Sequence, residues 1–222
     1  MTRTEAFDAG EGEDGRMSTP AGSPVRALLL DADGVVQYPE LGWTGQLDDL
    51  GGSPGFFRDV SAAELRALTG EADLAELVGD LIDSRGLDVT FAELLAIWCR
   101  IELDPVMVKL VGRVRDAGLV TALATNQQSY RGAYMQQAFG YQDLFDRTFY
   151  SFEVGLRKPD PAYFRTVVDA LGVRPEEAVF VDDMLANVLG AREAGLRAVL
   201  FPATDTHGHL RLKLRAAGVP GV

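Results

Sequence analysis

Short runs of apolar residues alternate with amphipathic stretches over most of the chain. Residues 161–171 have apolar positions at helical spacing, with Asp160 before them as an N-cap and Gly172 after them as a terminator. Five apolar runs have the length and composition of buried strands, at residues 25–30, 119–125, 148–150, 178–183 and 196–201. Apolar strands that alternate with amphipathic helices are typical of a parallel sheet covered on both faces. We therefore predict an α/β fold with a doubly wound parallel sheet.

A block of helical patterns interrupts this alternation. Residues 61–64 have the Ser-x-x-Glu spacing of a helix-starting capping box, and residues 90–93 repeat it as Thr-x-x-Glu before a helix through Ile101. Between these two signals, residues 72–84 place apolar side chains on one helical face. Residues 38–54 are rich in glycine and aromatic residues and are predicted to form a loop. The pattern thus indicates a small helical subdomain inserted into the α/β fold.

Residues 1–24 have a different composition. Their few large apolar side chains cannot bury enough surface to offset the entropy of ordering, so we predict a flexible tail. The tail lacks the apolar run of a secretory signal, and the chain has no long uncharged segment able to span a membrane. On these grounds we expect a cytoplasmic protein.

Charge and cysteine content exclude several classes of function. The net charge of −12 disfavours binding to nucleic acid or to an anionic membrane surface, because both need clustered Lys and Arg. The single cysteine excludes a disulfide framework and a cysteine-based zinc site within one chain. A small molecule is therefore the expected partner, and the sequence gives no indication of oligomeric state.

Polar side chains gather where the predicted strands end. The carboxyl ends of parallel strands meet at one edge of a sheet, which is where such folds bind ligands. The residues that follow the strands or a nearby loop are Asp31, Asp33, Thr125, Asn126, Lys158, Asp182 and Asp183. Carboxylates brought this close repel one another and need a cation, and oxygen ligands favour Mg²⁺. With Lys158 beside that cation, a phosphate is the natural anion for the site; Asp31 would then attack phosphorus and Asp33 would transfer protons.

At these residues the sequence resembles the haloacid dehalogenase-like hydrolase superfamily. Four motifs occur in the family's order, and the resemblance covers about residues 25–201. The motifs are Asp31-Ala32-Asp33-Gly34, Thr125-Asn126, Lys158-Pro159, and Phe180-Val181-Asp182-Asp183 followed by Asn187. The resemblance implies a Rossmann-like core made of residues 25–37 and 104–222. Residues 38–103 would be an α-helical cap inserted after the first motif.

The resemblance also implies roles for individual residues. Asp31 would be the nucleophile and a Mg²⁺ ligand, and Asp33 the general acid and base, with its backbone carbonyl on the metal. Thr125 and the Asn126 backbone would hold the phosphoryl oxygens, while Lys158 would neutralise charge between Asp31 and the phosphate.

The fourth motif would complete the metal site. Asp183 is the preferred direct ligand, and Asp182 would act through water or through Lys158. Asn187 would contact these ligands and orient them without binding the metal itself.

These expectations favour a Mg²⁺-dependent phosphomonoesterase that acts on a small cytosolic phosphate ester through an aspartyl-phosphate. A haloacid dehalogenase is an alternative, disfavoured because dehalogenases of this family lack an Asp at position 33. A phosphomutase is another alternative and would need a cap that excludes water. A sensor that binds phosphate without turnover is the non-enzymatic alternative, disfavoured because both Asp31 and Asp33 are present. No residue in the sequence identifies the substrate.

Overall fold

The computed structural model of the protein describes residues 23–222, so the predicted tail lies outside the described residues except for its last two positions. A five-stranded sheet, in which every neighbouring pair of strands is parallel, forms its centre in the order β5-β4-β1-β6-β7. The strands are β1 (Ala27–Leu30), β4 (Val120–Thr125), β5 (Arg147–Tyr150), β6 (Ala178–Asp182) and β7 (Arg197–Leu200). Each coincides with one of the predicted apolar runs. No helix in the described part of the chain is long and apolar enough to cross a membrane.

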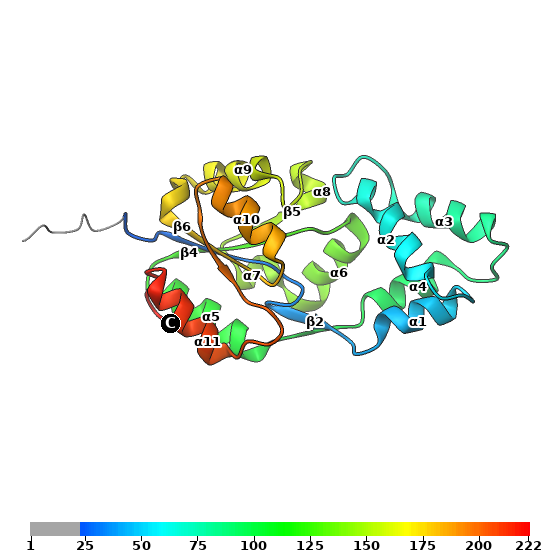
Figure 1. Ribbon diagram of the computed structural model, residues 1–222, viewed down its shortest axis with the longest axis horizontal. Helices are drawn as coiled ribbons and strands as arrows, with labels where there is room; N and C mark the ends of the chain where they lie inside the picture. The colour runs from blue at the N-terminus through cyan, green and yellow to red at the C-terminus, as the bar shows by residue number, and fades with distance from the viewer. Residues whose placement is uncertain (1–22) are drawn as a thin grey trace, which may run out of the picture.

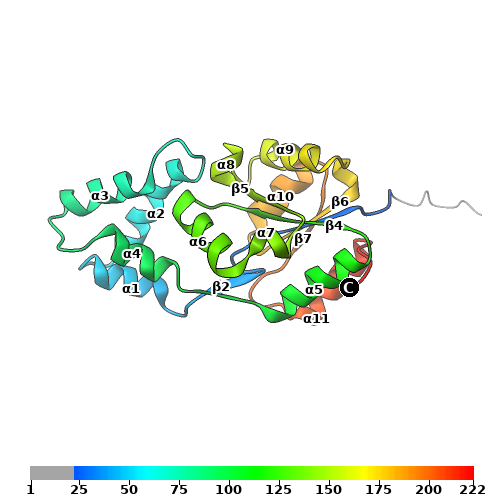
Figure 2. The same cartoon turned by 180° about the vertical axis from the view of Figure 1, so that it is seen from behind.

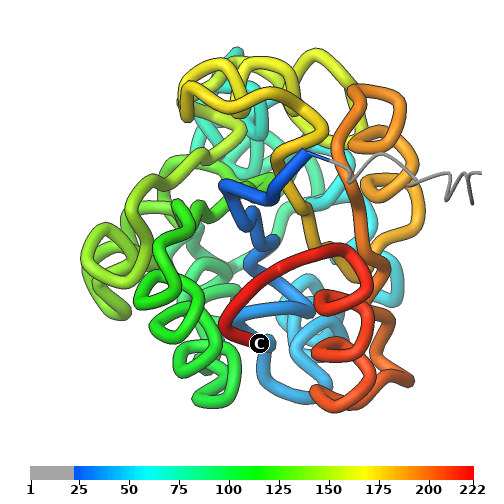
Figure 3. The backbone as a smooth tube through the Cα atoms, turned by 90° about the vertical axis from the view of Figure 1, so that its left-hand side faces the viewer, coloured from blue at the N-terminus to red at the C-terminus, as the bar shows by residue number. Residues whose placement is uncertain are grey.

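Helices cover both faces of this sheet, which confirms the predicted doubly wound arrangement. Successive residues of β1 point to opposite faces, so Leu28 and Leu30 belong to one apolar cluster and Ala27 and Leu29 to another. On the first face lie α5 (Pro105–Asp116), α6 (Ser129–Phe139), α7 (Tyr141–Leu144) and α11 (His207–Ala216). On the second face lie α9 (Pro161–Leu171) and α10 (Leu185–Glu193). Figure 1 shows α9 and α10 above the sheet and α5 and α11 below it, and Figure 3 shows the same layers from the end of the molecule.

Four helices form a separate cluster beyond the carboxyl ends of the strands (Figures 1 and 2). They are α1 (Trp43–Leu50), α2 (Phe56–Ala67), α3 (Leu74–Ser84) and α4 (Phe91–Trp98). Their buried side chains make an apolar core of their own, distinct from the two clusters that flank the sheet. Two short antiparallel strands, β2 (Gln37–Pro39) and β3 (Ile101–Leu103), join this helical block to the rest. The short helices α8 (Ser151–Val154) and η1 (Pro175–Glu177) complete the fold.

Within the helical block, several element boundaries predicted from the sequence differ from those of the structure. The predicted loop at residues 38–54 contains β2 and α1, and Ile101 begins β3 instead of ending a helix. The capping box predicted for residues 61–64 is wrong because these residues lie inside α2, which begins at Phe56. The first turn of α2 is instead capped from a distance, because Asp48 Oδ1 accepts hydrogen bonds from the backbone N–H groups of Gly55 (3.1 Å) and Phe57 (2.8 Å).

Other signals were correct. The Thr90–Glu93 capping box is present at the start of α4, and Asp160 caps α9 as predicted. The hydrophobic pattern did not predict α11, in which Leu210 and Leu214 are buried and Leu212 is exposed.

Candidate active site

Three carboxylates meet at the carboxyl ends of β1 and β6. Asp31 follows β1 directly, Asp182 is the last residue of β6, and Asp183 comes next in the chain. The backbone N–H of Asp31 donates to the carbonyl of Val181 (3.0 Å), which continues the β1–β6 pairing up to the site. One carboxylate oxygen from each of the three Asp residues lies within 4.8 Å of the other two. This all-oxygen donor set is suited to a hard divalent cation.

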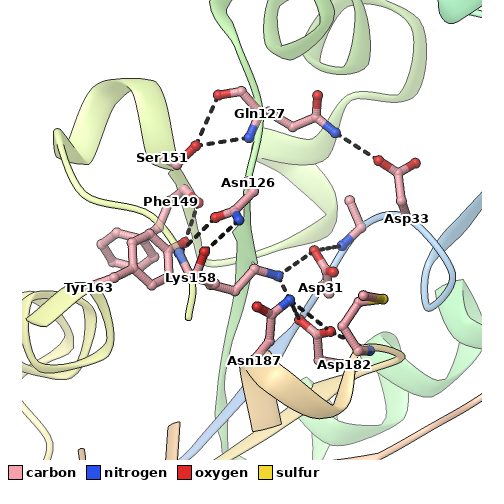
Figure 4. A network of polar contacts seen from close by, with 12 residues as sticks. Asp31, Asp33, Asn126, Gln127, Phe149, Ser151, Lys158, Tyr163, Asp182 and Asn187 are labelled. Carbon is pink, nitrogen blue, oxygen red and sulfur yellow. Dashed lines mark hydrogen bonds and ion pairs between the residues drawn. The ribbon is translucent and has the colours of Figure 1, made fainter. Parts of the chain in front are cut away.

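Lys158 reaches into the same cluster from the loop before α9 (Figure 4). Its buried Nζ lies 2.7 Å from Asp31 Oδ1 and 2.7 Å from Asp182 Oδ2. The side chain of Asn126 holds this loop, because its Oδ1 accepts from Lys158 N (2.8 Å) and its Nδ2 donates to Lys158 O (2.9 Å). The resemblance implies only a backbone role for Asn126, and these side-chain hydrogen bonds add a second role in holding the loop.

Two glycines allow the chain to approach these groups closely. Gly34 has a φ of +76°, and a Cβ there would lie 2.5 Å from Asp183 Oδ2. In α10, a Cβ on Gly190 would lie 1.9 Å from the carbonyl oxygen of Pro159, next to Lys158. Side chains at either position would push the site apart.

Burial dominates the electrostatics of the cluster. It raises the pKa of Asp31 to about 8, an effect that Lys158 opposes and Asp182 increases. Burial and the neighbouring Asp182 likewise raise the pKa of Asp183 to about 6. Three carboxylates face one ammonium group, so negative charge remains in excess when all of them are ionised. A bound cation would remove that excess and favour the ionised form of Asp31.

Asp33 does not join this cluster through its side chain. Its carboxylate instead forms a bidentate pair with Arg131, with Nη1–Oδ2 at 2.5 Å and Nη2–Oδ1 at 2.8 Å. Gln37 Nε2 donates to Oδ1 (2.9 Å) and Gln127 Nε2 donates to Oδ2 (2.8 Å). Burial by itself raises the pKa of Asp33, but Arg131 and the donated hydrogen bonds outweigh burial and hold that pKa below its usual value.

Arg131 is a site residue that was not predicted from the sequence. The residue lies in α6, is buried, and donates from Nε to the carbonyl of Trp98 (3.1 Å) at the end of α4. It therefore connects Asp33 to the helical block. The one sequence signal for Arg131 is its position, two residues beyond Ser129 on a helix that begins just after the Thr125 motif. Its partner Asp33 lies 98 positions earlier in the chain.

The remaining predicted residues lie at the same edge of the sheet. Thr125 is the buried last residue of β4, and Asn187 in α10 donates from Nδ2 to both oxygens of Asp182, at 3.1 and 3.0 Å. The backbone N–H of Met184 also donates to Asp182 Oδ1 (2.8 Å). Asp182 is thus held by three neighbours, while Asp31 Oδ2 has no hydrogen bond or ion pair among residues 23–222.

A cavity of about 210 Å³ lies between this edge and the helical block. Asp33, Asn126, Gln127 and Arg131 line it from the core side. Its other walls are formed by Pro39, Trp43, Phe57, Ser61, Glu64, Leu68 and Trp98. A wider groove of about 620 Å³ beside α4 contains none of the carboxylates at the strand ends. The smaller cavity is therefore the one that connects to the chemistry of the site.

The chain is similar to known proteins of one family. A model of haloacid dehalogenase-like hydrolases matches residues 25–195. Phosphoserine phosphatase of Thermus thermophilus is 40% identical over 101 residues, which are 45% of this chain and 41% of that protein. Bifunctional epoxide hydrolase 2 of Sus scrofa is 24% identical over 209 residues, which are 82% of this chain and 37% of that protein. The chain spans less than half the length of these curated relatives.

Solved structures have the same fold. A haloacid dehalogenase family enzyme from Bacteroides thetaiotaomicron superposes with a TM-score of 0.74 at 21% identity, covering 85% of this chain and 98% of that one. Another structure of that enzyme, with a TM-score of 0.71 at 22% identity over 84% of this chain and 98% of that one, is a complex with magnesium and inorganic phosphate. The family model covers most of the chain and the fold agrees with it, so the chain belongs to the haloacid dehalogenase-like hydrolases.

Proposed function

We propose that the protein is a Mg²⁺-dependent phosphomonoesterase that acts on a small phosphate ester through an aspartyl-phosphate. The observation that carries the proposal is the cluster of Asp31, Asp182 and Asp183 with Lys158 buried against it. The donor set fits the ion, because it consists of oxygens with an excess of negative charge. The phosphatases among the relatives, and the magnesium and phosphate held by the Bacteroides enzyme, support the same proposal.

The two oxygens of Asp31 have different surroundings. Oδ1 accepts from the backbone N–H of Ala32 (2.7 Å) and from Lys158, whereas Oδ2 is the freer oxygen. In the proposed reaction one carboxylate oxygen of Asp31 forms a bond to phosphorus as the ester P–O bond breaks. Lys158, whose loop is held by Asn126, would balance the charge of the phosphate against that of Asp31. The Thr125 hydroxyl and the Asn126 backbone are the proposed phosphoryl contacts.

Asp33 is the proposed source and acceptor of the proton. Protonated Asp33 gives its proton to the leaving alkoxide. In the second half-reaction ionised Asp33 takes a proton from water as that water attacks phosphorus. The bond from Asp31 to phosphorus then breaks and inorganic phosphate leaves. The pairing with Arg131 favours the ionised form of Asp33, which suits the base of this second step and opposes the protonated form that the first step needs. In the proposed cycle, the proton that Asp33 takes from water is the one that it gives to the next leaving group.

Metal ligation is assigned to Asp31, Asp183 and the backbone carbonyl of Asp33. Asp182 lies within the same cluster, and its bonds to Lys158 and Asn187 suit it to orienting the site through those partners or through water. The chemistry that Mg²⁺ supplies in such a site is stabilisation of negative charge on the phosphoryl oxygens.

Helices α1–α4 are the proposed cap. They form one wall of the cavity of about 210 Å³ beside Asp33, where the leaving group would lie, and would limit the entry of bulk water.

The test is phosphate release from a panel of small esters, with Mg²⁺ and with EDTA, by the wild type and by Asp31→Asn. Asp88→Asn is the matched control, because Asp88 is an exposed residue of the helical block with the same charge and size. We expect turnover that needs Mg²⁺, is abolished in Asp31→Asn and is retained in Asp88→Asn. Turnover that survives both EDTA and Asp31→Asn refutes the mechanism, and chloride release from 2-chloropropionate by the same preparation would favour dehalogenation.

A further inference from the structure

Glu64 is an acidic residue on the cap side of the cavity that the proposed mechanism does not use. It lies in α2 and lines the cavity opposite Asp33 and Arg131. Among residues 23–222 its carboxylate has no hydrogen bond and no ion pair within 4.0 Å, although burial, opposed by Arg131 and reinforced by Asp33, raises its pKa to about 7. The side chain is partly buried and lines the cavity, so its unpaired carboxylate is available to accept a hydrogen bond from a molecule bound there.

The walls around Glu64 are aromatic. Trp43 packs edge-on against Phe57, with ring centroids 4.9 Å apart, and stacks on Trp98 at 6.3 Å. All three rings line the cavity, and their contacts with one another fix the orientation of that wall. The volume of about 210 Å³ lies below the roughly 300–1,000 Å³ of typical ligand pockets, which favours a compact leaving group. Such a wall favours a short carbon skeleton or an ammonium group that contacts ring faces.

The charges of the cavity oppose a second anion. Both terminal nitrogens of Arg131 donate hydrogen bonds to the Asp33 carboxylate, and its Nε donates to the backbone carbonyl of Trp98. Arg131 is the only Lys or Arg residue among those that line the cavity. Two carboxylates, Asp33 and Glu64, thus share one guanidinium group. A leaving group with its own carboxylate or phosphate would be repelled by these two carboxylates and would find no unpaired cation among the residues that line the cavity.

We propose that Glu64 determines substrate specificity by accepting a hydrogen bond from a hydroxyl or ammonium group of a compact leaving group that carries no anionic group. The inference rests on the proposed phosphatase function and names the class of ester that this site would select. Ser61, one turn earlier in α2, and Gln127 offer further hydrogen bonds to such a group. The aromatic rings would contact its carbon atoms.

Four esters of similar size test the proposal: phosphoethanolamine, glycerol 1-phosphate, propyl phosphate and 2-phosphoglycolate. The readout is the ratio of kcat/KM for each ester to that for propyl phosphate. We expect a ratio of about ten or more for the ammonium ester or the hydroxyl ester in the wild type, and the lowest ratio for 2-phosphoglycolate. Which of the two donor esters is preferred distinguishes an ammonium group from a hydroxyl group.

Two variants and a control separate a specific effect from a structural one. Glu64→Gln keeps a neutral acceptor, so we expect about a tenfold loss in the ammonium ratio, a smaller loss in the hydroxyl ratio and a gain for 2-phosphoglycolate. Glu64→Ala removes the acceptor and both preferences. Glu71→Gln changes the charge of the helical block equally at an exposed position and should leave all ratios unchanged. Ratios in the Glu64 variants equal to those of the wild type, or 2-phosphoglycolate as the best substrate, would overturn the proposal.

A binding measurement tests the specificity proposal without depending on turnover. Calorimetry on Asp31→Asn with Mg²⁺ gives the affinity for the same four esters without turnover. If the wild type releases phosphate neither from these four esters nor from the panel that tests the proposed function, the phosphatase proposal fails. The specificity proposal then stands if adding Glu64→Gln to Asp31→Asn abolishes discrimination among the esters, and it falls if discrimination is absent or unchanged.

Discussion

Lys158 holds together two carboxylates that folding brings out of water, so replacing it should be among the most destabilising changes in the core. The perturbation we consider is Lys158→Met, which keeps the length of the side chain and removes its charge. The Lys158 and Asp182 side chains are both 0% exposed, and Nζ contacts Asp31 and Asp182 at 2.7 Å each. Removing one partner of a buried ion pair typically costs about 3–5 kcal/mol, because the other partner stays buried and unpaired.

Urea unfolding in EDTA at pH 8 measures this cost for the wild type, Lys158→Met, Asp182→Asn and the double variant. We expect Lys158→Met to lose about 3–5 kcal/mol of unfolding free energy. The double variant should lose less than the sum of the single variants by about 2 kcal/mol, which is the coupling of a direct contact. A loss below about 1 kcal/mol together with additive single effects would refute the buried pairing and the charge-balancing role that rests on it.

Three further predictions follow from other contacts. Arg131→Met removes the bidentate partner of the proposed acid–base carboxylate and should lower kcat about 100-fold in steady-state assays with Mg²⁺, whereas an unchanged kcat would argue against that role. Gly190→Ala should lower the unfolding free energy by about 1–3 kcal/mol and should also lower the activity, because its Cβ would lie 1.9 Å from the Pro159 carbonyl oxygen. Gly112→Ala is the control, because a Cβ at this helical position would meet open space. Its unfolding free energy, measured in urea, should rise by about 0.5–1 kcal/mol. Folding raises the pKa of Glu64 from 4.5 to about 7, so it favours the protonated acid, and the wild type should lose stability relative to Glu64→Gln as pH rises from about 4.5 to 7. The loss is at most about 3 kcal/mol and smaller where water enters the cavity, and a pH-independent difference in unfolding free energy would contradict the shift.

Local sequence predicted the parts of the fold that local physics determines. The three inner strands β4, β1 and β6 are almost entirely buried and mostly apolar, because a parallel sheet with helices on both faces buries both sides of each inner strand. The edge strands β5 and β7 are shorter apolar runs that remain partly exposed. The polar residues after those strands needed only the rule that parallel strands end at one edge. Asp31, Lys158 and Asp182 were therefore expected to lie close together, and they are in direct contact.

Features that depend on distant contacts were not predictable in this way. Arg131 has the charge of a surface residue, and its burial depends on a carboxylate 98 positions earlier in the chain. The start of α2 was misplaced because Asp48, several residues upstream, provides the caps that Ser61 was expected to provide. Glu64 was then taken for part of a capping signal, whereas its significance comes from the cavity that only the folded chain forms.

The short ribbon of β2 and β3 has a consequence for how this protein can change. Gln37 pairs with Leu103 and Pro39 with Ile101, so the chain leaves the core and returns to it at nearly the same point. Because the ends of the insertion are already adjacent, doubling its length would add only about 0.6 kcal/mol of loop-closure entropy. An entire helical block can thus be exchanged by recombination while the strand register under the carboxylates stays in place. Under the proposed function, a new helical block would change the selection of the leaving group without rebuilding the carboxylate cluster at the strand ends.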